Sequence, residues 1–425
     1  MTKVQVLGSV LFGVMFVMFG MLAANGLNPE DIASPYLGGW FFEHGAQADI
    51  YGFPPKEMFS GMIPQTWLEA AKQADIPANT LYPFVYPPIW AALLGPVTKV
   101  ISFTAFSKLV YLVHFILIYL SMVLAWRLSG RPGVFIAWAM VVSAYIFSAL
   151  PSISALAQNQ PQILVVFLLL LGLERLAAGH SMSAGVILAL AATLKITPVL
   201  LIVLFIVKKD WRGFWAMVAT GAAVIVASFS LAGIDLHLAY LAYVADMGNV
   251  AFISKFNWSF ASSLYQLSAE SMSYPLGAAY PLGAVGVNYT ADLPPWISVL
   301  STGLLLLGVV YWLIRVHRAP ARLRPIVYAI FFIWIGFFGP LGWPYYYLPV
   351  LFLWPAVIFY YPSPIWRLFA FAMFIGVFRM EILLYIRSLG SAFDMGQLYG
   401  AAAVLAVLLL LVIVQWRAFK KIDPV

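Results

Sequence analysis

The chain has 425 residues, 63% of them hydrophobic and only 9% charged, and its mean hydropathy is +0.94. Because soluble domains are about 45–50% apolar and about 25% charged, this composition excludes a soluble enzyme and a disordered protein. The net charge of +7 comes from short basic clusters between apolar runs, which indicates membrane topology and not nucleic-acid binding. The chain has no cysteine, which excludes disulfides, thiolate metal sites and a cysteine nucleophile.

About ten apolar runs are long enough for membrane-spanning helices, which need about 20 residues each. The first run is long for a signal peptide and lacks a clean cleavage site, so we expect it to remain as a span. The sequence therefore predicts an all-α polytopic membrane protein, with residues 1–425 forming a single integral membrane domain. In chain order the runs are 5–25, 108–126, 133–150, 162–178, 213–233, 296–314, 325–342, 345–361, 366–388 and 396–416.

Basic residues are concentrated in alternate connections between these runs. One set of connections holds 15 of the 23 basic residues against three acids, whereas the segment 26–85 carries seven acids and two lysines. The positive-inside rule then puts both termini in the cytoplasm and two long connections, 26–108 and 234–295, on the extracytoplasmic side. Because the composition without cysteine is typical of a bacterial protein, we expect the bacterial inner (plasma) membrane.

The segment 183–207 has basic flanks on both sides, at Arg175 and at Lys208. Both flanks therefore belong to the cytoplasm, but 25 residues are too few for two crossings. We expect a re-entrant pair of half-helices that turns near Lys195–Pro198. Because non-helical backbone inside a membrane must line a cavity or be buried in protein, Lys195 is expected beside a cavity. The alternative is one long tilted helix whose lysine reaches an interface.

Two basic residues stand out within apolar segments. A charge inside the membrane costs at least about 2.5–3.5 kcal/mol, so Lys195 is a functional candidate, unless it only holds the hairpin together. Arg379 lies 13 residues into the run 366–388, about 20 Å from its start. It is a second candidate, or a structural contact to a neighbouring helix. Glu381 would face away from Arg379 on a continuous helix.

Asp31 lies just beyond the first apolar run, at the start of the acid-rich connection. A carboxylate in this place could remove a proton from a substrate that meets a membrane-bound reactant. The plainer interpretation is a solvated acid or a helix cap, as for most exposed acids. The alternative bases are Glu30, Glu43, His44 and Asp49.

Several short motifs follow one another along the chain. An aspartate, a glycine 14 residues later and an aromatic residue come first. Then come Tyr-Pro-Pro, a glutamine that opens a span, Leu-Lys-x-Thr-Pro and, in the second long connection, Asn-x-Ser. The residues are Asp31, Gly45, Tyr51, Tyr86, Pro87, Pro88, Gln160, Lys195, Thr197, Pro198, Asn257 and Ser259. This ordered set resembles glycosyltransferase family 87, the GT-C-type mannosyltransferases that use a polyprenol-phosphate-mannose donor.

Two features depart from the family pattern. The family often has histidines just after the tryptophan of a late Ser-Pro-x-x-Trp element, whereas Trp343 is followed by Pro344 and three tyrosines. A tyrosine in place of the family histidine is therefore an open question. The aromatic residue that the family has four positions after the aspartate is Pro35, with Tyr36 one place later. These departures leave the sugar and the acceptor open.

The resemblance implies a GT-C-like fold, with about ten full spans, the re-entrant pair of half-helices and two long extracytoplasmic loops. It also implies an inverting transfer of a sugar, with mannose as the family expectation, from a polyprenyl-monophosphate donor to an envelope glycolipid or glycan on the extracytoplasmic side. In this reaction Asp31 is the catalytic base. The implied donor-phosphate ligands are Lys195, Arg379 and Lys255, and the implied substrate-binding residues are Tyr36, Tyr86, Gln160, Asn257, Trp343, Tyr345 and Tyr346.

The residues present suit such chemistry. One base suffices for a single inverting step, the transition state resembles an oxocarbenium ion, and nearby cations stabilise the leaving phosphate. We expect no cofactor and no metal, because a monophosphate leaving group needs less charge neutralisation than a diphosphate. A divalent ion at Asp31, Glu30 and Asp49 is the alternative.

Two other classes of protein stay open at this point. A lipid or polysaccharide transporter would explain the many spans and the intramembrane charges, but the long acidic connection and the lack of an internal repeat disfavour it. A non-catalytic subunit of an envelope assembly complex would leave Asp31 and Lys195 unexplained. The expected partners are the lipid-linked donor, the acceptor and membrane lipids, with no nucleic acid.

Overall fold

The computed structural model describes residues 2–27, 29–59, 62–77, 81–268, 289–360, 363–388 and 395–420. Most of these residues are helical, and two short strands pair antiparallel within the second long connection. The middle of that connection, 269–288, lies outside the described residues.

The described residues form helices, 3-10 helices and two strands. In chain order they are α1 (Lys3–Ala23), α2 (Glu30–Glu43), η1 (Gln47–Asp49), α3 (Pro55–Phe59), α4 (Gln65–Gln73), α5 (Pro88–Val100), α6 (Phe103–Leu128), α7 (Phe135–Ile146), α8 (Leu150–Ala157), α9 (Gln162–Ala177), α10 (Ser181–Leu194), η3 (Thr197–Leu201), α11 (Ile202–Val207), α12 (Trp211–Gly248), β1 (Val250–Ile253), α13 (Phe260–Ser268), β2 (Tyr289–Asp292), α14 (Pro295–Arg318), α15 (Arg324–Phe338), η4 (Pro344–Tyr347), α16 (Leu348–Leu353), α17 (Pro355–Tyr360), α18 (Pro364–Val377), α19 (Met380–Ser388) and α20 (Met395–Lys420).

Several helices have the length and composition of membrane spans. Among the described residues, five helices meet both criteria: α1, α6, α12, α14 and α20. The number is seven if each of two bent pairs is one span, namely α7 with α8, bent by 70°, and α18 with α19, bent by 51°. The prediction of an all-α polytopic membrane protein is therefore confirmed, whereas the count of about ten spans is not.

The difference in span count comes from short and broken helices. Within the run 325–342, α15 has 15 residues and covers about 22 Å, which is less than the hydrocarbon thickness. The run 345–361 is divided into η4, α16 and α17. Pro349 and Pro355 stand at the starts of the latter two, where a proline interrupts the hydrogen bonding of the preceding turn. Both runs are apolar throughout, so hydropathy alone does not indicate the breaks.

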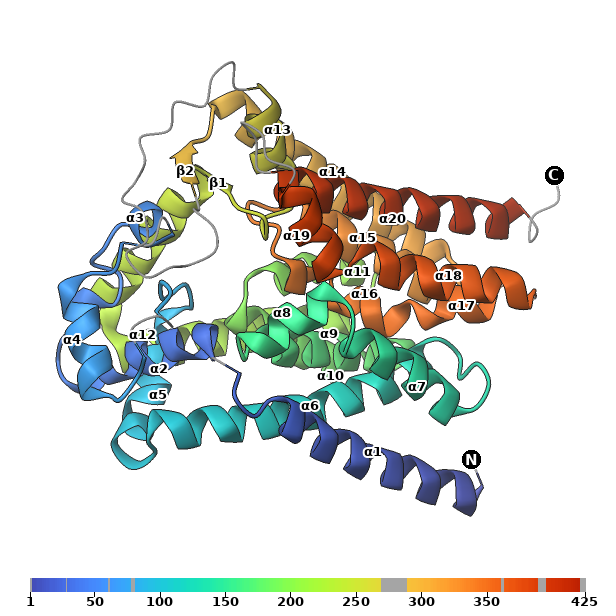
Figure 1. The fold of residues 1–425 in the computed structure, drawn as a ribbon, viewed down its shortest axis with the longest axis horizontal. Helices are drawn as coiled ribbons and strands as arrows, with labels where there is room; N and C mark the ends of the chain where they lie inside the picture. Colours follow the sequence, from blue (N-terminus) through green and yellow to red (C-terminus); the bar gives the residue numbers. More distant parts are fainter. Residues whose placement is uncertain are drawn as a thin grey trace.

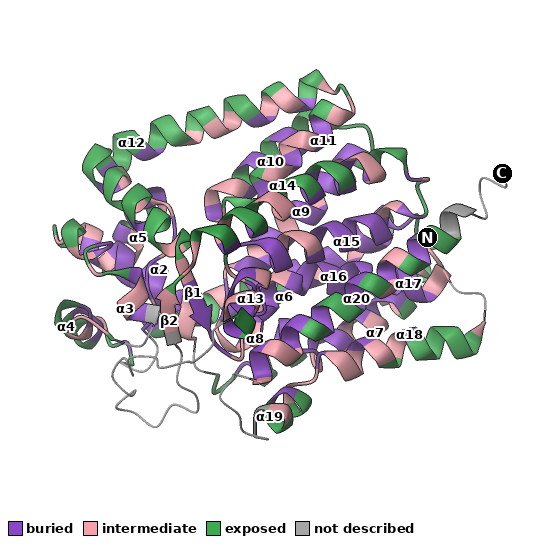
Figure 2. Cartoon of the chain, turned by 90° about the horizontal axis from the view of Figure 1, so that it is seen from above, coloured by how far each residue is buried: buried purple, intermediate pink, exposed green. Residues whose placement is uncertain are grey.

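The long helices run roughly side by side, and both ends of the chain lie at the same end of this bundle (Figure 1). Helices α2, α3, α4 and α5 and the two strands lie at the opposite end (Figure 1). Exposed residues follow much of α12 (Figure 2), and many of them are apolar, such as Leu231 and Ile234. Exposed apolar side chains on a long helix are expected where the helix faces lipid.

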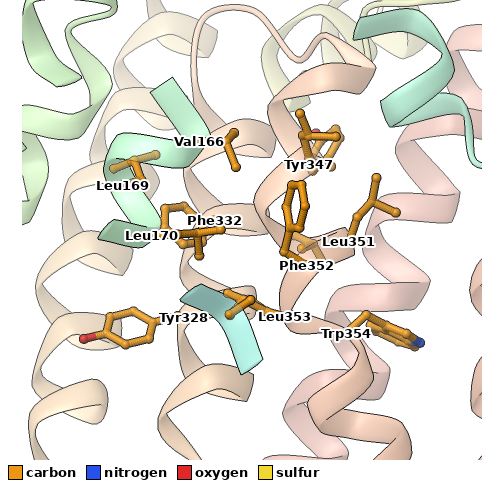
Figure 3. Packing of buried hydrophobic residues seen from close by; sticks show 14 of the residues in the cluster. Val166, Leu169, Leu170, Tyr328, Phe332, Tyr347, Leu351, Phe352, Leu353 and Trp354 are labelled. Atoms are coloured by element: carbon orange, nitrogen blue, oxygen red, sulfur yellow. The ribbon is translucent and has the colours of Figure 1, made fainter. Parts of the chain in front are cut away.

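The main hydrophobic core lies inside the bundle and fixes η4. Tyr347 and Leu351 pack among side chains of neighbouring helices, including Phe332 of α15 and Leu170 of α9 (Figure 3). Trp354 is fully buried and donates from Nε1 to the carbonyl oxygen of Ala370 at 3.1 Å. This packing anchors one end of η4, whose other residues reach the site described below.

The chain turns back on itself between α10 and α11. Lys195 is extended, with φ −144° and ψ 135°, and ends α10. A Cβ atom built on Gly185 of α10 would meet the carbonyl oxygen of Gly213, and one built on Gly213 would meet the ring of Phe205 in α11. Gly185 and Phe205 are 20 positions apart, yet both lie beside Gly213 at the start of α12. One straight helix would separate them by about 30 Å. The alternative of one long helix is excluded, and the position of the turn inside a membrane stays a prediction.

This close approach generates a prediction about stability. Gly185→Ala should lower the free energy of unfolding by about 1–3 kcal/mol, because the new methyl group must push two helix backbones apart. Gly221→Ala is the matched control, since a Cβ there meets nothing within 4 Å and removing a helical glycine should raise stability by about 0.5–1 kcal/mol. Unfolding of both variants in one detergent measures the difference, and equal stabilities would contradict the proximity of α10 and α12.

Candidate active site

Asp31 lies in the first turn of α2 and is held by the turn between α8 and α9. Its N–H donates to the carbonyl oxygen of Gln158 at 3.0 Å, and Nε2 of Gln160 donates to its Oδ2. Both glutamines reach the same aspartate because Asn159 between them has a left-handed backbone, with φ 50°, which asparagine tolerates better than most residues. Asn159 is itself fixed by a 3.0 Å hydrogen bond from Nδ2 to the carbonyl oxygen of Ser107.

Tyr86 orients the amide of Gln160. The Tyr86 hydroxyl donates to Oε1 of Gln160 at 3.3 Å, and the Tyr51 hydroxyl donates to the carbonyl oxygen of Tyr86 at 2.5 Å. Since Oε1 accepts from the tyrosine, Nε2 is the amide atom that faces Asp31. The aspartate therefore meets a donor that suits its ionised form.

Lys195 lies close to the same aspartate. Its ammonium is 4.8 Å from the ring centroids of both Tyr345 and Tyr346 in η4, within the range of a cation–π contact. Just before Lys195, the carbonyl oxygen of Thr193 accepts a 2.7 Å hydrogen bond from Nε1 of Trp90 in α5. Among the described ion pairs Lys195 has no carboxylate partner within 4.0 Å, so the two rings are contacts that can stabilise its charge without neutralising it.

The carboxyl of Asp31 has a shifted pKa. Burial raises the pKa of Asp31 to about 7, the positive charge of Lys195 opposes this rise, and the neighbouring Glu30 adds to it. Helix α2 is not among the candidate membrane-spanning helices. A carboxyl with a pKa near neutrality is suited to proton transfer, because a general base works best when its pKa is close to the working pH.

A cavity of about 230 Å³ lies next to this network. Glu30 of α2 and Ser154 and Gln158 at the end of α8 supply polar lining, and Trp343 and Tyr345 supply aromatic lining. Tyr345 therefore contacts both the cavity and the ammonium of Lys195. The structure thus brings together Asp31, Gln160, Tyr86, Lys195, Trp343, Tyr345 and Tyr346.

Arg379 and Lys255 are sequence neighbours of cavity-lining residues. Arg379 precedes Met380, which lines the cavity, and the Lys255 ammonium lies 4.9 Å from the ring of Phe256, which also lines it. The expectation that Glu381 faces away from Arg379 is wrong. The helix breaks between α18 and α19, and two of the three guanidinium nitrogens of Arg379, Nε and Nη2, each donate to Glu381 at 2.9 Å.

Two of the residues expected to bind substrate make hydrogen bonds within the protein, and their expected role stays a prediction. The hydroxyl of Tyr36 donates to the carbonyl oxygen of Ile101 at 2.7 Å. Asn257 is 0% exposed. Its Nδ2 donates to the carbonyl oxygen of Phe252 at 2.6 Å, and its Oδ1 accepts from the N–H of Gly342 at 2.7 Å. In this structure Asn257 connects the second long connection to the residue before Trp343, and neither Tyr36 nor Asn257 lines the cavity.

Apart from Glu30, the alternative bases do not line the cavity. Glu43 is at the far end of α2, about 18 Å along the helix from Asp31, and pairs with Lys99. His44 is exposed, and its Nδ1 lies 2.8 Å from the carbonyl oxygen of Trp40. Within the described ranges, no three histidine or acidic side chains form a group that could hold a metal ion, so Asp31, Glu30 and Asp49 do not converge on one.

Sequence reasoning missed the roles of Gln158 and Ser154. Gln158 supplies the backbone acceptor for Asp31, and both residues line the cavity. A polar Gln-Asn-Gln segment just before an apolar run was the available signal. It marks a turn, but it does not indicate which distant residue the turn contacts.

The helical bundle defines a polytopic membrane protein. Its polar site holds a carboxyl suited to proton transfer, a cation and an adjacent cavity, as an enzyme would need. The family model of glycosyltransferase family 87 matches residues 84–337, which is more than half of the chain, so the protein belongs to that family and is a glycosyltransferase. The matched range contains Tyr86, Gln160 and Lys195, begins after Asp31 and ends before Trp343. No curated protein matches the chain.

The contacts of Asn257 generate a prediction. Asn257→Ala should lower the free energy of unfolding by about 1–3 kcal/mol for each buried polar group that loses its partner, one in Phe252 and one in Gly342. Asn249→Ala is a matched control, since its side chain is exposed and bonds only within its own helix. Unfolding in detergent measures both variants. Wild-type stability of Asn257→Ala combined with weakened substrate binding would restore the sequence-based role of Asn257 as a substrate contact.

Proposed function

We propose that this glycosyltransferase transfers a sugar from a polyprenyl-monophosphate donor to a hydroxyl group of an envelope glycolipid or glycan, with inversion at the anomeric carbon. The observation that carries the proposal is that a carboxylate, Asp31, and a half-buried cation, Lys195, lie near each other and beside a cavity. Mannose is the family expectation for the sugar. Membership of the family favours the enzyme over a transporter or a non-catalytic subunit.

Asp31 acts as the base in this proposal. Gln160 occupies Oδ2, which leaves Oδ1 to accept the proton of the acceptor hydroxyl. The acceptor oxygen then forms a bond to the anomeric carbon while the bond from that carbon to the phosphate oxygen breaks. The phosphate leaves with the electron pair of the broken bond, and the proton stays on Asp31. A single base is sufficient because the displacement is one step.

Lys195 stabilises the leaving phosphate. Its charge lies near aromatic faces and has no described carboxylate within 4.0 Å, so it can still pair with an anion in a region of low dielectric, where such pairing is strong. In this role Tyr345 and Tyr346 position the lysine, at a place where the family often has histidine. We propose that Lys195 makes a divalent ion unnecessary, so transfer should survive a chelator.

The arrangement of the chain supports an extracytoplasmic site. Both termini lie at one end of the bundle, and α2 with Asp31 lies toward the other (Figure 1). Together with the basic connections near the termini, this favours cytoplasmic termini in a bacterial inner membrane. A donor already in the bilayer would then meet its acceptor at the outer surface.

The first test is loss of the base. Asp31→Asn should lower the transfer rate by at least about 100-fold, the lower end of a general base contribution, while the donor still binds. The assay uses the purified protein in nanodiscs, radiolabelled polyprenyl-phosphate sugars and a membrane glycolipid extract. Glu43→Gln, at the far end of α2, should transfer at the wild-type rate. Full transfer by folded Asp31→Asn would move the base to another acid, Glu30 first.

The proposal also predicts how the transfer rate depends on pH, which the same assay measures. Only the carboxylate form of Asp31 accepts a proton, and burial raises its pKa to about 7, so wild-type transfer should fall as the pH is lowered from about 7 to about 5. Besides burial, the groups that shift the pKa of Asp31 are Lys195, which lowers it, and Glu30, which raises it; Gln160, Tyr86, Tyr345 and Tyr346 also face Asp31. A flat profile over this range would contradict the assignment.

The second test concerns the positioning of Lys195. Lys195→Ala should raise the donor KM strongly. Tyr346→Leu, which removes one ring, should raise it about three- to tenfold, the size of a partly desolvated cation–π contact. Tyr346→Phe keeps the ring and should recover most of the loss. Equal donor KM values for the leucine and phenylalanine variants would show that the ring does not position the lysine.

A further inference from the structure

The cavity beside Asp31 has the lining of a carbohydrate site. Glu30 contributes a carboxylate, Ser154 a hydroxyl and Gln158 an amide, while Trp343 and Tyr345 contribute rings. The two rings are nearly parallel, with 17° between their planes and 6.2 Å between their centroids. A few polar groups among aromatic side chains are typical of a pocket that orients a small polar ligand.

The charge of the cavity differs from that of the phosphate site. Glu30 is the only charged side chain among the described residues that line it, so an anionic phosphate is disfavoured there. The ammonium of Lys195 is not part of the lining, although it lies over the ring of Tyr345. The cavity and the cation are therefore neighbours that share one tyrosine but favour ligands of different charge.

Glu30 has unused hydrogen-bonding capacity. Its Oε2 accepts from the Tyr82 hydroxyl at 3.3 Å, and Gln158 also hydrogen-bonds its carboxylate. A carboxylate offers about four acceptor positions, so about two remain for a ligand. Vicinal hydroxyl groups of a sugar ring are suitable donors for them, and the apolar face of such a ring can pack against an aromatic wall.

The volume limits the ligand to a small one. At about 230 Å³, the cavity is smaller than the roughly 300–1,000 Å³ of pockets that enclose drug-sized ligands. It can take one ring and not an oligosaccharide. Asp31 is not part of the lining, but the Glu30 carboxylate is close enough to raise the pKa of Asp31, so a ring held by Glu30 lies near the proposed base.

We propose that this cavity, named here the Glu30 pocket, binds one uncharged, hydroxyl-rich ring of the acceptor, its terminal sugar. The inference rests on the proposed function, which assigns the donor phosphate to Lys195. In the Glu30 pocket the carboxylate and Ser154 accept hydrogen bonds from ring hydroxyl groups, and Trp343 covers the apolar face. The rest of the acceptor stays outside the pocket.

The test uses soluble mimics of one sugar ring in the nanodisc assay. A methyl hexoside and the matched methyl hexuronide, which carries a carboxylate, compete with the glycolipid extract at pH 8. The hexoside should inhibit competitively against the acceptor and not against the donor. The hexuronide should inhibit at least tenfold more weakly, because Glu30 repels its carboxylate.

Removing the negative charge should remove this discrimination. Glu30→Gln should raise the acceptor KM at least fivefold, leave the donor KM within twofold and bring the two competitors to similar potency. Glu43→Gln is the control and should discriminate as the wild type does. If Glu30→Gln does not fold, Ser154→Ala, which removes a lining hydroxyl without touching the tyrosines, should likewise raise the acceptor KM and leave the donor KM unchanged.

The outcomes separate the two proposals. Equal inhibition by both sugars in the wild type, or competition of the hexoside with the donor, would overturn the Glu30 pocket as an acceptor site. A donor KM that is unchanged in Lys195→Ala would instead overturn the donor assignment, whatever the Glu30 variants do. Loss of discrimination in Glu30→Gln, together with a raised donor KM in Lys195→Ala, would support both.

Discussion

The partial burial of an aspartate, Asp31, and a lysine, Lys195, in the same region, without a direct ion pair, is the constraint that organises this protein. Each charge is costly to bury, so each needs its own polar contacts. Asp31 accepts a hydrogen bond from the amide of Gln160, and the ammonium of Lys195 lies over two tyrosine rings. Because the two do not neutralise each other in direct contact, both keep their capacity to act on a substrate.

The surrounding scaffold serves these two residues. The left-handed Asn159 directs both flanking glutamines to the start of α2. At the other side of the site, Asn257 holds the backbone of Gly342, just before the aromatic segment. A Cβ at Gly342 would lie only 2.7 Å from the carbonyl carbon of Trp258. Small and polar residues at the turns thus bring distant segments close enough to form the site.

The sequence predicts some parts of this arrangement well, for identifiable reasons. A lysine between two apolar segments with basic flanks indicates a turn, and the structure turns at Lys195. The break before α19 is different: Arg379 and Glu381 lie beside it, but a charged residue can also occur inside a continuous helix and does not show that α18 ends at Val377. The contact between Arg379 and Glu381 therefore could not be predicted. The burial of Asn257 could not be predicted either, since its partners lie up to 85 residues away and a local motif does not identify them.

Tyr345 links the two halves of the proposed site, because its ring contacts the lysine and also lines the cavity. A ligand that shifts this ring on one side changes the free energy of binding on the other. Such coupling between two ligands is reciprocal: if the donor strengthens the binding of the acceptor by some factor, the acceptor strengthens that of the donor by the same factor. One aromatic wall can in this way favour the ternary complex over either binary complex, which limits unproductive contact of the activated sugar with water.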